Sequence, residues 1–149
     1  MSHLLTALAI VGNQRFLSHM IEAEANAIDA ADAVLCAGVG YANFAINHKA
    51  LFRLIFASDR PNQDDLELKK VGSAAFKHLA DHVETLNGIH PYDDAKSMRD
   101  AAAIWAAAHG IADLLSSGKL SSLQGMDSAN RVASIKDMLR RSLPSAAKT

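Results

Sequence analysis

Apolar residues recur at three- and four-residue spacing along almost the whole chain, and no segment shows the sustained alternation of a β-strand. This periodicity predicts an all-α protein, an antiparallel bundle of about six helices. The predicted helices cover residues 2–27, 29–47, 49–56, 64–86, 94–117 and 126–143. Because no tandem repeat, low-complexity run or linker divides them, we interpret residues 1–149 as one domain.

Residues with special backbone or capping properties mark the helix ends. Asp29 or Asp32 can cap the second helix, and Gly88 and Gly118 follow the fourth and fifth helices as C-terminal stops. Pro144 ends the last helix. Residues 58–63 have the composition of a loop.

Two glycines and a cysteine stand inside the second predicted helix. Gly38 and Gly40 lower its stability, so we expect a neighbouring helix or a ligand to approach closely there. Cys36 is the chain's single cysteine, which excludes an intrachain disulfide and a cysteine-based zinc cage. We interpret it as a buried thiol that packs like a small hydrophobic side chain.

Composition narrows the partners of the chain. Half of the residues are hydrophobic but only 5% are aromatic, and alanine is abundant, which favours closely packed helices. The net charge is −1, with 15 cationic residues interleaved among 16 acidic ones, so we expect no DNA binding by this chain alone. The apolar stretches at 4–11 and 33–48 do not resemble a leader peptide or a membrane span. We expect a soluble cytoplasmic protein.

The sequence offers little that points to catalysis or to a metal. His78 and His82 are four residues apart, so they share a helix face and are able to hold a metal ion together. However, they do not form a His-Glu-x-x-His motif, and no third ligand stands nearby in the sequence. We therefore interpret them as surface histidines and expect no metal and no other cofactor. Because there is no nucleophile elbow, phosphate-binding glycine loop or paired carboxylate, we do not expect an enzyme.

Two segments about fifty residues apart carry a family resemblance. Residues 41–56 contain Tyr41, a Phe-Ala pair at 44–45, and a Leu-Phe-Arg-Leu run at 51–54. Residues 104–120 contain a Trp followed four residues later by His-Gly, and then Gly-Lys-Leu. Together they resemble the C-terminal, ligand-sensing and dimer-forming domain of TetR-type transcriptional regulators, in the subgroup marked by Trp-His-Gly. The first segment also contains His48. The family commonly has proline directly after this histidine, where Lys49 stands here.

The resemblance implies an effector-binding and dimerisation domain. In this family a three-helix DNA-reading domain precedes the region, and we expect no such helix-turn-helix domain in this chain. The alternative is a stand-alone helical protein that sequesters a ligand or forms homodimers or mixed dimers. A third hypothesis is a helical scaffold with a solid core and no ligand.

The resemblance also implies a homodimer. In such regulators the last two long helices pair with their symmetry mates in a four-helix interface, which corresponds to 94–117 and 126–143 here. Small residues on the first helix and an apolar stripe on the second suit close packing. The predicted interface residues are Ala101, Ala108, Gly110, Val132, Ile135 and Leu139. The alternative is that the alanines pack inside the monomer.

A sensing pocket is expected among the earlier helices. Such pockets are mostly apolar and carry a few placed polar groups. The predicted lining residues are Phe44, His48, Phe52, Phe56, Phe76 and Trp105, with His109 as a polar group. The alternative is that these side chains fill a solid core. The expected effector is a small, largely apolar molecule, and the sequence does not select one.

Overall fold

Residues 2–144 are the part of the chain that the computed structural model describes. They form seven α-helices and one 3₁₀ helix, joined by turns and loops. The helices are α1 (Ser2–Ala23), α2 (Ala30–Asn47), α3 (Lys49–Phe56), α4 (Leu66–Asn87), η1 (Pro91–Asp93), α5 (Ala95–Ser116), α6 (Ser121–Gln124) and α7 (Ser128–Arg140). The described residues contain no strand, which confirms the predicted all-α class. Residue 1 and residues 145–149 of the predicted single domain lie outside them.

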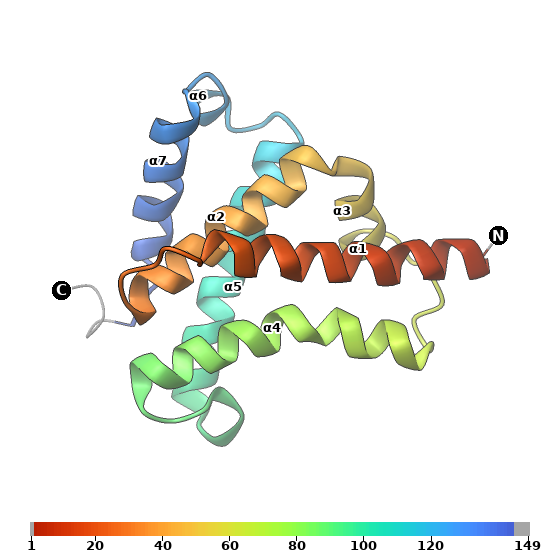
Figure 1. The fold of residues 1–149 in the computed structure, drawn as a ribbon, viewed down its shortest axis with the longest axis horizontal. Helices are drawn as coiled ribbons and strands as arrows, with labels where there is room; N and C mark the ends of the chain where they lie inside the picture. The colour runs from red at the N-terminus through yellow and green to blue at the C-terminus, as the bar shows by residue number, and fades with distance from the viewer. Residues whose placement is uncertain (1, 145–149) are drawn as a thin grey trace.

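Helix α2 lies at the centre of the fold. It is apolar nearly all round, and most of its residues from Ala33 to Ala45 are buried. A helix with this pattern must be covered on several sides. Accordingly, α2 packs against α1 on one side and against α5 and α7 on others (Figure 1). Cys36 is buried within it, as predicted.

The two glycines of α2 permit this close packing. A Cβ atom at Gly40 would lie 2.5 Å from the carbonyl oxygen of His19 in α1. A Cβ atom at Gly38 would overlap Cδ1 of Leu139 in α7. The prediction that a neighbour approaches α2 at these glycines is confirmed, and the neighbours are helices α1 and α7.

Aspartates begin the four longest helices after α1. In each case the side chain accepts a hydrogen bond from a backbone N–H three residues on, which satisfies a donor that the first turn leaves unpaired. The capping residues are Asp29, Asp65, Asp94 and Asp127. Gly88 and Gly118 take positive φ values of 75° and 73° after α4 and α5, the conformation that glycine adopts most readily.

Three predicted boundaries are wrong. Helix α1 ends at Ala23 and a turn follows, whereas the periodicity predicts a helix to residue 27. The last predicted helix, 126–143, is shorter, because the Asp127 cap starts α7 at Ser128 and the helix ends at Arg140. The one-turn helices η1 and α6 were not predicted, since a single turn is too short to show a periodic pattern.

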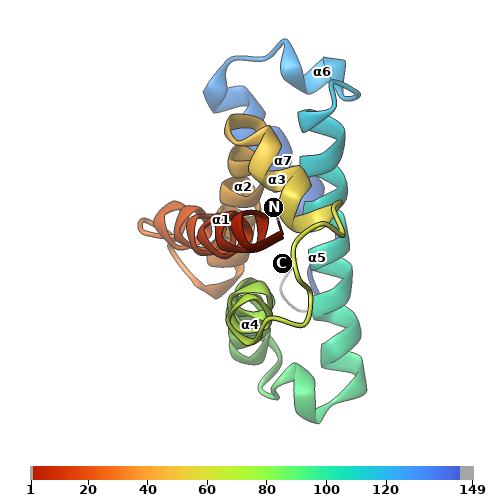
Figure 2. The same ribbon diagram turned by 90° about the vertical axis from the view of Figure 1, so that its right-hand side faces the viewer.

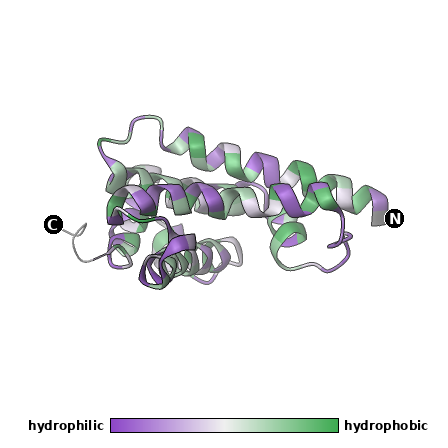
Figure 3. Ribbon diagram, turned by 90° about the horizontal axis from the view of Figure 1, so that it is seen from below, coloured by the Kyte–Doolittle hydropathy of each residue, from purple (hydrophilic) through white to green (hydrophobic). Residues whose placement is uncertain are grey.

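The long helices do not all run along one axis. Helices α1 and α4 lie side by side, and α5 crosses behind them (Figures 1 and 2). Helix α5 forms one edge of the molecule in Figure 2, so part of its surface faces outward. Hydrophilic and hydrophobic positions are interspersed along the helices (Figure 3). Within residues 2–144, no helix combines the length and apolar character needed to cross a bilayer.

A partly buried ion pair connects α2 to α7. The Lys136 ammonium donates a hydrogen bond to Asp32 at 3.2 Å, and the Ile28 N–H donates to the other carboxylate oxygen at 3.2 Å. Burial by itself would raise the pKa of Asp32, but the hydrogen bonds from Ile28, Lys136 and Cys36 together with the charge of Lys136 outweigh it, and the pKa of Asp32 is lowered. The N-terminal end of α2 is thereby held against the C-terminal helix.

Candidate functional site: an aromatic cluster beside a cavity

Aromatic side chains from four helices meet where α1, α2, α3 and α5 converge. The Phe16 ring lies edge-on to Tyr41 with centroids 4.6 Å apart, and it contacts Phe56 at 5.3 Å and Trp105 at 6.2 Å. Phe52 and Phe56, one turn apart on α3, lie 5.0 Å from each other. Such edge-to-face and tilted pairs add to the stability gained from burial.

A single hydrogen bond orients the polar groups of this cluster. The Tyr41 hydroxyl and Nδ1 of His109 are 2.7 Å apart, which links α2 to α5. The His109 ring also lies 5.5 Å from Phe52 and 5.0 Å from Phe56. Burial raises the pKa of Tyr41, so its phenol stays neutral and keeps a proton for this bond.

A cavity of about 500 Å³ opens beside the cluster, between α1, the end of α3, α4 and α5. Polar and apolar groups share its wall about equally, with side chains from all four helices and from the loop that joins α3 to α4. The lining residues are Ala9, Asn13, Leu54, Ile55, Phe56, Pro61, Gln63, Leu68, Lys69, Gly72, Ser73, Phe76 and Trp105. Small-molecule pockets commonly measure about 300–1,000 Å³.

The polar groups of the cavity lie on different sides. Asn13 is buried on α1 and donates its side-chain amide to the Ala9 carbonyl at 2.9 Å. Lys69 and Ser73 are exposed, one turn apart on α4, and Gly72 between them is exposed as well. The cavity therefore combines apolar and aromatic side chains with buried and exposed polar groups, among them the cationic side chain of Lys69.

The structure separates the seven predicted pocket residues into two groups. Phe56, Phe76 and Trp105 line the cavity. The other four do not belong to its lining: Phe44 and Phe52 are buried in the core, His48 lies against His19 and Phe44 where α2 meets α3, and His109 binds Tyr41.

Sequence reasoning missed several residues of this site. Phe16 lies on a helix that the periodicity predicts and Tyr41 belongs to the family resemblance, but neither is among the predicted site residues, although both are central to the aromatic cluster. Asn13, Lys69 and Gly72 line the cavity although nothing in their local pattern marks them. A cavity depends on where helices diverge, and periodicity does not report that.

The predicted interface residues are also divided. The side chains of Ala101, Ala108, Ile135 and Leu139 are at most 5% exposed and pack within the protomer. Gly110 and Val132 are partly exposed. The outward face of α5 consists instead of Ala102, Ala103, Ala106, Gly110, Asp113 and Leu114.

Comparison with known proteins gave one family match. The model described as "Tetracyclin repressor-like, C-terminal domain" matches residues 34–141, which is more than half of the chain. The matched region begins in α2 and ends just after α7, so it includes both resembling segments. Neither the curated proteins nor the solved structures gave a match.

Proposed function

The chain belongs to the tetracycline-repressor-like C-terminal domain family, and from this premise we propose that it binds a small effector molecule in the cavity beside Trp105 and forms a homodimer. The family is regulatory rather than enzymatic. The observation that carries the proposal is the 500 Å³ cavity, because it has the size of a ligand pocket, presents three aromatic side chains, and adjoins both segments that carry the family resemblance.

The cavity lining suggests the chemistry of the effector. Phe56, Phe76 and Trp105 offer aromatic faces to an apolar or ring-containing body. Lys69 at the opening would attract a carboxylate, sulfonate or similar anionic end. The proposed effector is therefore a small, largely apolar molecule that carries at most one anionic group.

For dimerisation we propose the outward face of α5. Ala102, Ala106 and Gly110 are small and succeed one another at intervals of four residues, which permits a close approach of a symmetry-related helix. Val132 on α7 is the partly exposed member of the predicted interface on that helix. This proposal keeps the predicted helices but replaces the four buried residues with their exposed neighbours.

Dye binding tests the cavity. We expect the apolar anionic dye 1-anilinonaphthalene-8-sulfonate to bind the native dimer and to quench the fluorescence of Trp105, the chain's single tryptophan. Gly72→Leu should weaken the apparent affinity of the dye, measured by this quenching, at least about tenfold, because the new side chain extends across the opening. A Cβ atom at Gly72 meets nothing within 4 Å, so the fold should tolerate the change. Equal quenching in both proteins, with unchanged circular dichroism, would place the dye elsewhere and contradict the proposal.

Sedimentation velocity tests the interface. We expect the wild type to sediment as a dimer and Gly110→Leu to dissociate, because a leucine on the α5 face separates the two helices. A Cβ atom at Gly110 also meets nothing within 4 Å, so the protomer itself should remain folded. The two glycine variants serve as controls for each other: Gly72→Leu should stay dimeric, and folded Gly110→Leu should still bind the dye. A Gly110→Leu protein that remains fully dimeric would exclude this face.

A further inference from the structure

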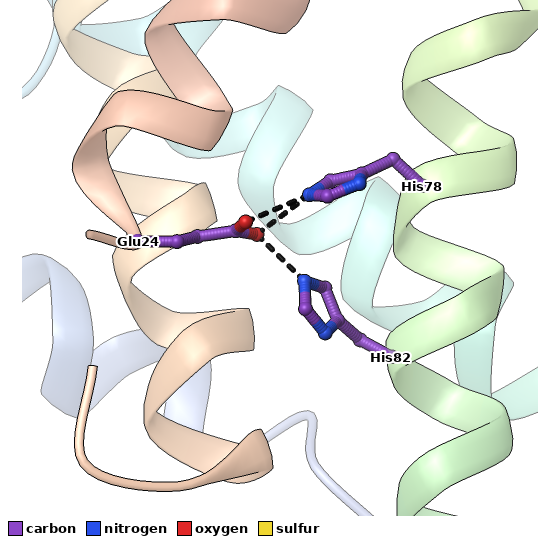
Figure 4. Close-up of side chains that lie close together, drawn as sticks. All are labelled: Glu24, His78 and His82. Carbon is purple, nitrogen blue, oxygen red and sulfur yellow. Dashed lines mark hydrogen bonds and ion pairs between the residues drawn. The ribbon is translucent and has the colours of Figure 1, made fainter. Parts of the chain in front are cut away.

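Two histidines and a glutamate converge at the end of α1. His78 and His82 lie one turn apart on α4, and Glu24 is the first residue after α1 (Figure 4). Nε2 of His78 lies 2.9 Å and 2.8 Å from the two Glu24 carboxylate oxygens, and Nε2 of His82 lies 2.8 Å from one of them. Each ring thus directs its Nε2 atom at the Glu24 carboxylate.

From this geometry we propose that Glu24, His78 and His82 form a binding site for a divalent transition-metal ion, with Zn²⁺ as the best fit. One ligand atom from each residue lies within 4.8 Å of the other two. Two imidazole nitrogens and a carboxylate oxygen are a ligand set that Zn²⁺ accepts, and water can take the fourth position. The interpretation of His78 and His82 as plain surface histidines lacked the third ligand, which stands 54 residues earlier than His78 in the sequence.

The spacing of the ligand atoms suits entry of an ion. Tetrahedral Zn²⁺ binds nitrogen and oxygen at about 2.0–2.2 Å, which places neighbouring ligand atoms roughly 3.3–3.5 Å apart. The present N–O separations are 2.8–2.9 Å, so the carboxylate must withdraw by about 0.5 Å, a shift that rotation of the Glu24 side chain can supply. To bind the ion, each neutral imidazole presents an unprotonated Nε2 and carries its proton on Nδ1.

The environment of the trio favours an exchangeable ion. The side chain of Glu24 is 11% exposed and those of His78 and His82 are 25% and 23% exposed. The ligands are thus sheltered enough to be held in place but open to water on one side. Since three protein ligands leave one position to solvent, the site resembles an open zinc site more than a closed four-ligand one.

A second group of potential ligands, at the end of α4 and just beyond it, provides a comparison. Asp81, Glu84 and His90 also have atoms within 4.8 Å of one another, but both carboxylates are exposed. His90 lies 3.3 Å from Asp81 through Nε2, and its Nδ1 already accepts the Tyr92 N–H. Exposed acidic groups with one histidine make a poorer zinc site, so this group serves as an internal control.

Bound metal would tie the end of α1 to the middle of α4. These two helices already pack together, and the ion would add a link between segments far apart in the sequence. Because an ion that binds only the folded state stabilises it, Zn²⁺ should raise the unfolding temperature. This inference does not depend on the effector or on the dimer.

Metal titration of tag-free protein tests the site. After chelator treatment, the wild type should bind one Zn²⁺ per chain in isothermal titration calorimetry, with micromolar or tighter affinity. Co²⁺ in place of Zn²⁺ should give the intense visible absorption of tetrahedral coordination. Glu24→Gln and His82→Ala should each weaken Zn²⁺ binding at least about 100-fold, because each removes a direct ligand. His90→Ala should bind like the wild type.

Thermal unfolding gives an independent readout of the same variants. Zn²⁺ at about a hundred times its dissociation constant should raise the wild-type unfolding temperature by on the order of 5 °C, and should not raise that of folded Glu24→Gln. The proposal is overturned if the wild type binds no Zn²⁺ at free Zn²⁺ concentrations on the order of 100 micromolar. It is equally overturned if His90→Ala loses binding while Glu24→Gln and His82→Ala keep it.

Discussion

Replacing Gly40 with alanine is expected to destabilise the protein by about 3 kcal/mol, although alanine favours helix formation. The new Cβ atom would lie 2.5 Å from the His19 carbonyl oxygen and 3.0 Å from Cβ of Ala23. Both are parts of α1 that cannot move by a side-chain rotation. Helices α1 and α2 would therefore have to separate along their contact, which weakens packing at the centre of the fold.

Urea unfolding followed by circular dichroism measures this effect, and Gly72→Ala is the matched control. Gly72 also stands within a long helix, but a Cβ atom there meets nothing within 4 Å. The same substitution should raise the stability by about 0.5–1 kcal/mol through helix propensity alone. All proteins are compared at one concentration, because the apparent stability of a protein that associates depends on its concentration. Gly40→Ala with wild-type stability would show that the α1–α2 contact yields easily.

Much of the fold could be predicted because its determinants are local. Each long helix has apolar residues at helical spacing, and Asp29, Asp94 and Gly118 mark ends that capping chemistry explains. The predictions that failed concern the end of α1 and the short helix η1, where tertiary structure outweighs the local pattern. Helix α1 stops at Ala23 so that the chain can turn toward α2, and η1 depends on Pro91 and on the His90 ring that accepts the Tyr92 N–H.

The family match also followed from sequence, because the resemblance depends on residues whose order and separation can be read directly. The Trp-His-Gly element contributes Trp105 to the cavity wall, His109 to a hydrogen bond with Tyr41, and Gly110 to the outer face of α5. Trp105, His109 and Gly110, which lie within six residues on α5, thus face three different environments. A residue type alone does not say which environment it meets, which is why His109 was predicted as a pocket group.

Convergence of distant segments was beyond sequence reasoning. Asn13 and Gly72 line one cavity because α1 and α4 pack side by side, together with the α3–α4 loop. The Glu24 carboxylate reaches His78 only because α1 ends beside the middle of α4. Helical periodicity identifies the buried face of each helix but does not specify which residues of two helices stand opposite each other.

Replacing Phe16 with alanine is expected to cost about 3–5 kcal/mol, because its ring is 1% exposed and removal leaves a cavity that helices cannot close. Phe16 contacts the rings of Tyr41, Phe44, Phe56 and Trp105, so it connects α1 to α2, α3 and α5 at once. Loss of the ring should also loosen Trp105, which would shift its fluorescence maximum to longer wavelength in the folded protein.

Phe76→Ala provides the comparison that separates the two roles of aromatic residues here. Phe76 is partly exposed on the cavity wall and contacts the Trp105 ring at 5.6 Å, so its removal enlarges a space that already exists. We expect it to cost less than half as much stability as Phe16→Ala, about 1–2 kcal/mol, and to weaken dye binding more. Urea unfolding and dye titration of both variants measure the two effects. If Phe76→Ala proved the more destabilising change, the core would extend through the cavity wall, and the separation between an aromatic core and a ligand pocket would be wrong.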